Sequence, residues 1–469
     1  MQFINRKEEL AKLEEYYMLS QKRLITVAIS GLRRTGKTTL IKEFIKNKKA
    51  LYFFVYDSKT SLELLREFTE GLRKEKIITE LEAIDSWYLF FETIFKRCKN
   101  YVIVLDEVQN FISVDKSVFS ILQKNCDDFK EAPLNLIILG SLISLFKKIF
   151  EDKKQPLYGR ISAKIRLEPF TLSNSLETLS ILGYKEVGEM LQIYGIFGGF
   201  PKYYAAIEQF ELLNKNYAEV IKQLFIIENA PLETEVNDIL KQEFGRRSAL
   251  YYSMMHSIAI GKTKLNEIAA NLQMRESSIT RHLKELEEKF NLIKSTRSIS
   301  NKKNTRYSIN HPLIEFWFTF VYDKFSYYSI KDTASLMKDV KQNFNAYFGK
   351  RFEQICKEFL IVLNSKEKLP VKLEYLSNWW GHARQEDNRY EIEIDLIGLN
   401  QKARQIIFVE CKWKEDVDSE ELLKELKEKS KYVHWHDNKR EEYYCIIAKS
   451  FKRKAEGCLC LDLNDIAQV

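Results

Sequence analysis

One segment, Gly31-Leu32-Arg33-Arg34-Thr35-Gly36-Lys37-Thr38, constrains the fold of this chain more than any other. It matches the phosphate-binding pattern G-x-x-x-x-G-K-[ST] at all four fixed positions. The apolar residues 24–29 before it are typical of a buried strand, and residues 39–44 after it are typical of a helix. A strand, a glycine-containing loop and a helix in this order place backbone N–H groups and a helix N-terminus around phosphate oxygens. We therefore expect an α/β domain that binds a nucleoside triphosphate.

The fixed positions of this loop each have a chemical role. Gly31 and Gly36 let the backbone approach anionic oxygens and adopt unusual dihedral angles. Lys37 supplies a positive charge for the β- and γ-phosphates, and the Thr38 hydroxyl is a ligand for Mg²⁺. The expected cofactors are ATP and Mg²⁺, and the expected loop contacts are Gly31, Leu32, Arg33, Arg34, Thr35, Gly36, Lys37, Thr38 and Thr39.

An acidic pair follows a second apolar run about 70 residues downstream. Residues 101–105 are all apolar or aromatic, and Asp106 and Glu107 come directly after them. Parallel sheets bind ligands at the carboxyl ends of their strands, so both carboxylates are expected near the phosphates. Asp106 would hold Mg²⁺, and Glu107 would orient or deprotonate the attacking water. A strand that simply ends in surface acids is the alternative, but the spacing from the phosphate loop favours ATP hydrolysis.

These two motifs resemble the archaeal-type ATPase family, within the AAA+ and STAND-related group of P-loop ATPases. Residues 3–10 are similar to the N-terminal box of that family, and the resemblance implies that Asn5 and Arg6 lie near the adenine. Residues 198–201 resemble its lid motif, which implies that Pro201 packs against the nucleotide base.

Two further segments resemble the pattern of this family. Ser141 follows the apolar run 136–140, and the resemblance implies that it is the polar tip of a sensor strand that responds to the γ-phosphate. Arg160 lies in a segment whose arginine, by resemblance, could stabilise charge on a transferring phosphoryl group, in the same chain or across a homo-oligomer interface. An arginine after a glycine is also common in surface ion pairs, and this alternative stays open.

Length and composition indicate a multidomain protein. A chain of 469 residues is too long for one core, so three or four domains are expected. No apolar run reaches the ~18 residues of a membrane span, and the charged residues near the start do not form a signal peptide. The seven cysteines are scattered, which favours reduced thiols over disulfides. These observations predict a cytoplasmic protein.

The positive charge is concentrated in one segment, residues 241–306. It contains 14 Lys and Arg against 6 Asp and Glu, an excess of 8 that equals the net charge of the whole chain. Within it, residues 265–272 and 277–290 are expected to form two helices joined by a turn, a helix-turn-helix. The spacing of the apolar side chains in the second helix would turn Thr280, Arg281 and Lys284 outward.

The residues after these helices indicate a β-hairpin wing. Apolar positions near 292–294 and 307–309 flank a basic tip that contains Lys302, Lys303 and Arg306. Helix-turn-helix and hairpin together predict a winged helix, and the basic excess favours contact with DNA phosphates. Winged helices also serve as protein-contact modules, which is the alternative. The aromatic residues 311–322 that follow are expected to form a buried connecting helix.

A second acidic pattern lies near the C-terminus. Residues 390–399 and 405–413 are expected to form two strands joined by a polar turn. A hairpin centred on that turn pairs Leu399 with Ile406, and the same register pairs Asp395 with Glu410. Like charges directly opposite each other are destabilising unless a cation lies between them, so this pair suggests a Mg²⁺ or Mn²⁺ site.

This arrangement resembles the PD-(D/E)XK nuclease fold. Lys412 shares a face with Glu410, and the resemblance implies that it orients water or steadies charge on a scissile phosphate. Glu353 matches the acid that a preceding helix often supplies in that fold, so the implied metal ligands are Glu353, Asp395 and Glu410. The alternative is a solvated, charged hairpin in which Glu393 pairs with Lys412.

The expected architecture is an α/β P-loop ATPase core (1–167), a helical lid (168–242), a winged helix (243–312), an aromatic helical connector (313–345) and an α/β nuclease-like domain (346–469). The leading hypothesis is a protein that binds and hydrolyses ATP and binds DNA, and whose C-terminal domain could in addition cleave DNA with a metal ion. The alternative is a nucleotide-dependent regulatory switch that binds DNA or a protein and cleaves nothing.

Overall fold

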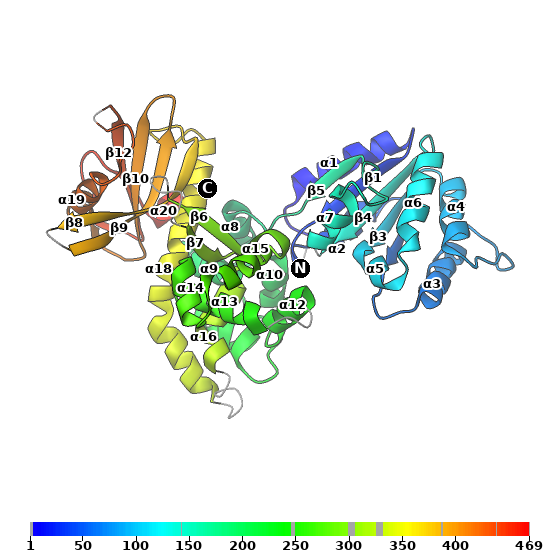
Figure 1. Ribbon diagram of the computed structural model, residues 1–469, viewed down its shortest axis with the longest axis horizontal. Coiled ribbons are helices and arrows are strands. Elements are labelled where there is room, and N and C mark those ends of the chain that lie inside the picture. Colours follow the sequence, from blue (N-terminus) through cyan, green and yellow to red (C-terminus); the bar gives the residue numbers. More distant parts are fainter. Residues whose placement is uncertain are drawn as a thin grey trace. The chain divides into compact units, whose positions relative to one another are not determined.

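The computed structural model describes residues 3–141, 143–244, 249–298, 305–324, 332–385, 388–437 and 439–468. The chain forms two compact units, shown in Figure 1. The first comprises Met1–Pro169 together with Phe200–Lys202, and the second comprises Phe170–Gly199 and Tyr203–Val469. The backbone therefore passes between the units three times.

The first unit is built on a five-stranded parallel sheet in the order β2-β3-β4-β1-β5. Because all five strands run in the same direction, their carboxyl ends meet at one edge, where the expected ligand residues lie. The strand β4 separates β1, which leads into the phosphate loop, from β3, which ends in the acidic pair. The strands are β1 (Ile25–Ser30), β2 (Ala50–Phe54), β3 (Tyr101–Asp106), β4 (Leu134–Gly140) and β5 (Ala163–Arg166).

Helices cover both faces of this sheet (Figure 1). The helices α1 (Lys7–Ser20) and α2 (Lys37–Ile45) pack on one face, where Leu13, Leu40 and Phe44 are buried. The other face is covered by helices that include α3 (Ser61–Lys74), α4 (Trp87–Arg97), α6 (Ser117–Asp128) and α7 (Ile143–Glu151). A short α5 (Phe111–Val114) follows the acidic pair.

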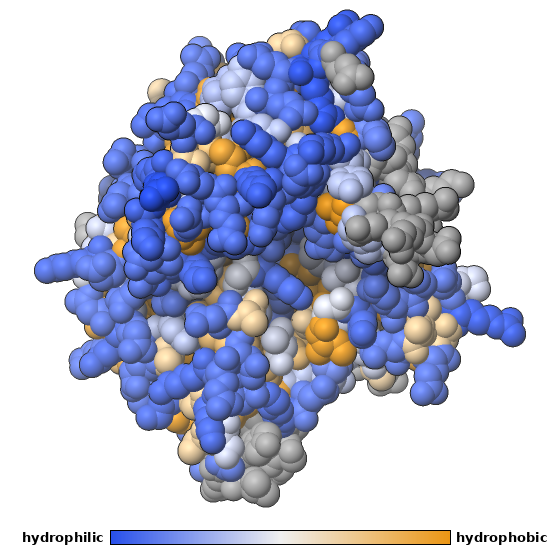
Figure 2. Space-filling view, turned by 90° about the vertical axis from the view of Figure 1, so that its left-hand side faces the viewer, coloured by the Kyte–Doolittle hydropathy of each residue, from blue (hydrophilic) through white to orange (hydrophobic). Residues whose placement is uncertain are grey.

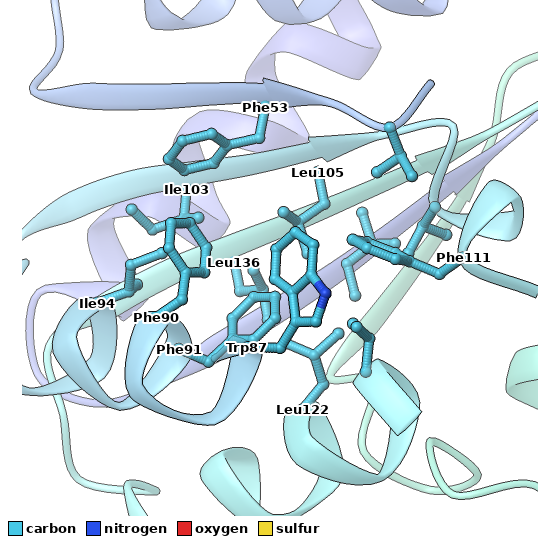
Figure 3. Packing of buried hydrophobic residues seen from close by; sticks show 14 of the residues in the cluster. Phe53, Trp87, Phe90, Phe91, Ile94, Ile103, Leu105, Phe111, Leu122 and Leu136 are labelled. Atoms are coloured by element: carbon cyan, nitrogen blue, oxygen red, sulfur yellow. The ribbon is translucent and has the colours of Figure 1, made fainter. Parts of the chain in front are cut away.

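The core on the second face is rich in aromatic side chains (Figure 3). Trp87, Phe90 and Phe91 of α4 pack beneath Ile103 and Leu105 of the sheet. Successive strand residues point to opposite faces, so neighbouring valines of β3 enter the other core while these two residues enter this one. Burial on both faces is the reason why the inner strands β1, β3 and β4 are nearly continuous apolar runs in the sequence.

The second unit begins with helices. They are α8 (Leu172–Ile181), α9 (Val187–Phe197), α10 (Pro201–Gln209), whose first two residues belong to the first unit, α11 (Tyr217–Ile221) and α12 (Glu235–Phe244). The expected lid, basic segment, connector and C-terminal sheet all share this unit. The separate domain boundaries inside it remain predictions.

Three helices and a hairpin form the basic segment. They are α13 (Ala249–Ala259), α14 (Leu265–Asn271), α15 (Glu276–Lys284), which continues as a π-helical turn (Glu285–Lys289), β6 (Ile293–Arg297) and β7 (Thr305–Ile309). The two predicted helices and both strands are confirmed. The apolar residues Ile279, Leu283, Leu286 and Phe290 are buried, as their spacing predicts. The aromatic connector is also a buried helix, α16 (Pro312–Phe320).

A five-stranded mixed sheet in the order β14-β12-β10-β9-β8 forms the C-terminal part of the unit. Its strands are β8 (Tyr375–Gln385), β9 (Asn388–Asn400), β10 (Gln405–Lys412), β12 (Glu441–Ala448) and β14 (Leu459–Leu461). The long helix α18 (Thr333–Ser365) precedes these strands, and α19 (Ser419–Ser430) packs on the sheet. A separate two-stranded sheet pairs β11 (Val417–Asp418) with β13 (Phe451–Arg453). The last helix is α20 (Leu463–Ile466). The predicted register is confirmed from Leu399–Ile406 to Leu396–Val409 in the antiparallel β9–β10 hairpin, and the predicted pair of Asp395 with Glu410 lies beyond this ladder.

Two further expectations concern membrane-spanning segments and the state of the thiols. Among the described residues, no helix combines the length and the apolar character that crossing a membrane requires. The face seen in Figure 2 is mostly hydrophilic, with hydrophobic side chains in small separate patches. All seven cysteines are free.

Candidate functional site

The phosphate loop joins β1 to α2 through two glycines that no other residue replaces easily. A Cβ atom on Gly31 would lie 2.4 Å from the backbone oxygen of Leu167, and Gly36 has a φ of 87° at the N-cap of α2. Lys37 is buried, and its ammonium donates to the backbone oxygens of Gly31 and Leu32, at 2.9 Å each. The loop is therefore a tight turn with a cation held against it.

The other predicted loop residues differ in exposure. Thr35 is buried and its hydroxyl donates to the backbone oxygen of Leu32 at 2.8 Å, so it stabilises the turn. Arg34 and Thr39 are exposed, and Arg33 is half-buried. Thr35 therefore acts within the loop, and contact of Arg34 and Thr39 with a ligand remains a prediction.

The first acid of the pair lies directly beside the loop. Asp106, at the end of β3, is 1% exposed, and its carboxylate accepts a hydrogen bond of 2.9 Å from the Thr38 hydroxyl. It also accepts from the hydroxyl of Tyr52 on β2 and from the backbone N–H of Glu107. Burial raises the pKa of Asp106, and the neighbouring Glu107 carboxylate adds to this rise. Hydroxyl and carboxylate oxygens are the ligands that Mg²⁺ prefers, so these residues fit that ion.

The second acid faces the sensor position. Glu107 has a φ of 55°, which ends the strand and turns the chain. Its carboxylate oxygens accept from the Ser141 hydroxyl at 2.7 and 2.8 Å, and the Gln109 side-chain amide also donates to it. Ser141, which follows β4, and Glu107, which follows β3, are thus brought together.

Sequence reasoning missed two residues of this network, Tyr52 and Gln109. Tyr52 is one aromatic residue in the apolar segment 50–54, and nothing in its spacing marks its hydroxyl as a partner of Asp106. Gln109 lies two residues after Glu107, and this proximity to the acidic pair is the only signal that the sequence offers.

Arg6 and Pro201 both lie beside the phosphate loop. The Arg6 guanidinium is buried and donates to the backbone oxygens of Thr35 at 3.1 Å and Glu168 at 2.7 Å. Arg6 and Asn5 both have positive φ angles, 65° and 64°. A Cβ on Gly36 would lie 3.8 Å from the Pro201 ring. Arg6 therefore braces the loop, and contact of Asn5, Arg6 or Pro201 with adenine remains a prediction.

Arg160 does not reach the phosphate loop of its own chain. Its guanidinium pairs with Asp127 at 3.1 Å and donates to the backbone oxygen of Tyr158 at 2.7 Å. Its backbone oxygen accepts from Thr26, near the start of β1, so Arg160 lies at the sheet edge opposite the loop. The expectation of an action within the chain is wrong, because a surface ion pair forms instead. Action across a subunit interface remains a prediction.

Comparison with known proteins agrees with this geometry. A family described as an ATPase domain predominantly from Archaea matches residues 3–207, and one described as archaeal and bacterial proteins of unknown function matches residues 317–430. An uncharacterised protein of Methanocaldococcus jannaschii is 31% identical over 472 residues, which cover 99% of this chain and 100% of that protein. The chain belongs to the archaeal-type ATPase family.

Two further comparisons concern parts of this archaeal-type ATPase. An uncharacterised ATP-binding protein of the same organism is 51% identical over 47 residues, which are 10% of this chain and 76% of that protein. The solved structure of a Walker-type ATPase of Pyrococcus abyssi is 20% identical, with a TM-score of 0.54 over 67% of this chain and 96% of that one. This likeness shows a shared fold.

The archaeal-type ATPase has a second acidic site in its C-terminal sheet. Asp395 of β9 accepts a 2.7 Å hydrogen bond from the backbone N–H of Cys411 on β10, beside Glu410. Glu410 is 4% exposed, and its carboxylate pairs with Lys412 at 2.6 Å and with Lys429 of α19 at 3.2 Å. Lys429 is one of many charged residues in its helix, so nothing in its sequence position indicates this contact.

The acids of this site influence one another. Burial, followed by the charges of Asp395 and Glu393, raises the pKa of Glu353 to about 8. Burial and the charge of Glu410 raise the pKa of Asp395 to about 6. Among the described residues, however, no group of three or more His, Cys, Asp or Glu side chains is arranged to hold a metal ion. The metal roles of Glu353, Asp395 and Glu410 therefore remain predictions.

The basic segment presents part of its expected surface. Thr280, Arg281 and Lys284 are exposed on α15, as predicted. Lys302 and Lys303 lie outside the described residues. Arg306 was expected on an exposed wing, but its side chain is only 21% exposed and pairs with Glu391 and Glu393 of β9. That exposure was predicted wrongly, because acids distant in sequence fold against the hairpin.

Proposed function

We propose that this protein is a Mg²⁺-dependent ATPase that couples its nucleotide state to DNA binding. The observation that carries the ATPase part is the contact network that joins Thr38 to Asp106 and Glu107 to Ser141 across three strand ends. It gathers an oxygen donor set, a candidate base and a polar sensor at the carboxyl edge of one parallel sheet.

In this proposal each residue of the network has a separate role in ATP hydrolysis. Thr38 and Asp106 would hold Mg²⁺, which when bound offsets negative charge on the phosphates. Lys37 and the backbone N–H groups of the loop would bind the β- and γ-phosphates. Glu107 would orient the attacking water and accept its proton, while Ser141 keeps the Glu107 carboxylate in position.

Phosphate release from Mg-ATP tests this part of the proposal. Lys37→Ala removes the loop cation and should reduce both ATP affinity and hydrolysis. Lys46→Ala is the matched control, because Lys46 is an exposed lysine at the end of the same helix, and it should leave both unchanged. Unchanged hydrolysis in Lys37→Ala would overturn the proposal.

We also propose that residues 249–309 form a winged helix that binds DNA. The order of three helices and a hairpin supports it, as do the exposed Thr280, Arg281 and Lys284 of α15. In the double variant R281A/K284A, affinity for duplex DNA should fall, and the slope of log affinity against log salt should decrease by about 2. The control K368A/K402A removes two exposed lysines elsewhere in the unit and should leave the slope unchanged.

For the C-terminal sheet we propose a nuclease-like fold. Support comes from the order helix, three antiparallel strands, helix and parallel strand, with Asp395, Glu410 and Lys412 on the central strands. One observation favours a regulatory switch that cleaves nothing: the Glu410 carboxylate is already paired with two lysines.

Cleavage assays separate these two functions. Circular and linear DNA would be incubated with Mg²⁺ or Mn²⁺, with and without ATP. Cleavage that disappears in Lys412→Ala and persists in Lys424→Ala, an exposed lysine of α19, would establish a nuclease. Absence of cleavage beside measurable ATP hydrolysis would establish the switch.

A further inference from the structure

Four charged side chains and one tryptophan connect the basic hairpin to the C-terminal sheet. We call this cluster the latch, and its residues are Lys264, Arg306, Trp380, Glu391 and Glu393. The Arg306 guanidinium bonds to Glu391 at 2.8 Å and also pairs with Glu393. The Lys264 ammonium bonds to the other carboxylate oxygen of Glu391 at 2.7 Å. One carboxylate thus takes a hydrogen bond from each of two cations.

Aromatic and backbone contacts support the latch. The Arg306 guanidinium carbon lies 4.5 Å from the centre of a ring of Trp380, a cation–π contact. The Ser298 hydroxyl, next to β6, donates to the backbone oxygen of Trp380 at 2.8 Å. Lys264 and Arg306 also form an isolated backbone bridge, so the two cations are fixed relative to each other.

A cavity of about 400 Å³ lies between the hairpin and the sheet. Its walls include the latch cations Lys264 and Arg306 and the latch acids Glu391 and Glu393. They also include Glu353 and Asp395, two acids of the candidate nuclease site. The latch and the acidic site therefore face the same space.

We propose that DNA phosphates and the carboxylates of Glu391 and Glu393 compete for Lys264 and Arg306, so that the latch restrains DNA binding and DNA binding opens the latch. This inference rests on the proposed DNA-binding function. Arginine binds carboxylate and phosphate oxygens through the same planar fork of N–H donors, so one guanidinium cannot serve both partners fully. Opening would also expose the cavity walls that carry Glu353 and Asp395 to the bound DNA.

The double variant E391Q/E393Q tests the competition. Glutamine keeps the size of the side chain, but it removes the charge that holds the cations and replaces one acceptor oxygen by an NH₂ donor. Affinity for a short fluorescent DNA duplex should rise about tenfold, and the salt slope should increase by about 2 because two freed cations can contact phosphates. The control E421Q/E425Q removes the same charge from exposed positions on α19 and should give a much smaller change.

Amide hydrogen exchange reports on the contact without DNA. Exchange in residues 305–309 and 390–396 should be faster in E391Q/E393Q than in the control, while exchange in β10 and β12 stays unchanged and shows that the unit is folded. Equal exchange in both variants would overturn the latch.

The outcomes distinguish the inference from the function on which it rests. If the wild-type protein binds DNA and E391Q/E393Q binds no more tightly than the control, the competition is overturned and DNA binding stands. If neither the wild-type protein nor E391Q/E393Q binds DNA at low salt, both the proposed DNA binding and the competition are overturned.

Discussion

The molecule holds two pairs of acids, and the two pairs are neutralised differently. Asp106 and Glu107 follow one another at the end of β3, whereas Asp395 and Glu410 lie on the adjacent strands β9 and β10. In the first unit, the hydrogen-bond partners described for Asp106 and Glu107 are hydroxyls, a side-chain amide and backbone N–H groups. In the second unit, Glu410 is paired with the ammonium groups of Lys412 and Lys429.

The pair Asp106 and Glu107 has no described lysine or arginine partner, whereas the Glu410 carboxylate is paired with two lysines of the same unit. Neutral donors orient a carboxylate without cancelling its charge, so the first pair keeps its attraction for Mg²⁺. Two lysines offset the charge of Glu410, so a metal ion there would have to compete with them. The comparison predicts that equivalent substitutions have different effects at the two sites.

The largest effect is expected for Glu107→Gln. Removing the candidate base while keeping its shape should lower the rate of ATP hydrolysis by at least about 100-fold, with ATP affinity retained. Phosphate release and binding of a fluorescent nucleotide would measure the two quantities. Glu43→Gln, at an exposed position of α2, is the control. A loss of only a few-fold would show that Glu107 is not the base.

Glu410→Gln should act on stability instead. It leaves Lys412 and Lys429 without their buried counter-ion, which breaks an ion-paired cluster at a cost of about 2 kcal/mol, less than for a fully buried pair because both lysines are partly exposed. Amide exchange in β10 and β12 should then be about 30-fold faster. Exchange that matches the exposed control Glu421→Gln would mean that the lysines do not depend on Glu410.

A substitution of Lys294 tests whether the second unit contains a buried ammonium group whose charge nearby acids do not offset. Burial, followed by the charges of Arg351 and Lys357, lowers the pKa of Lys294 to about 8. The charged form is therefore unfavourable in the folded unit below pH 8, and the penalty disappears as the pH rises toward the unfolded value of about 10.4.

Lys294→Met should accordingly stabilise the unit at pH 7 by about 1.5 kcal/mol, a value reduced for partial exposure, and by less at pH 9.5. Thermal unfolding of the full chain at both pH values would measure the difference from wild type. Lys262→Met, at an exposed position, should show no such pH dependence. A stabilisation that is equal at both pH values would contradict the lowered pKa.

The smallest effect is expected for Tyr52→Phe. It removes one neutral donor from Asp106 and leaves the Thr38 hydroxyl in place. Loss of one hydrogen bond of about 1 kcal/mol should reduce hydrolysis about fivefold. Tyr56→Phe, an exposed tyrosine just beyond the same strand, is the control. Equal rates in the two variants would show that Tyr52 does not position Asp106.

Features that depend on local spacing were predictable from the sequence. The phosphate loop, the acids at strand ends and the buried face of α15 follow from periodicity and from the order of apolar runs. The hairpin register of Leu399 and Ile406 followed from the length of the turn between their strands.

Features that depend on contacts distant in sequence were not predictable. The side chain of Arg160 is held by Asp127 of a helix 33 residues earlier, and Arg306 meets Glu391 from a strand 85 residues later. A basic residue near a hairpin tip looks exposed in sequence, because sequence alone does not show which surface folds against it. Lys429 was missed for the same reason.

The three-residue segment Phe200–Lys202 belongs to the first unit although the chain on both sides of it belongs to the second. A fragment ending at Pro169 would therefore lack Pro201, the residue beside Gly36. In evolutionary terms, the ATPase cannot be transferred to a new partner domain as one uninterrupted gene segment without α8 and α9 travelling with it. Any gene segment that encodes the whole first unit thus also encodes residues 170–199 of the second.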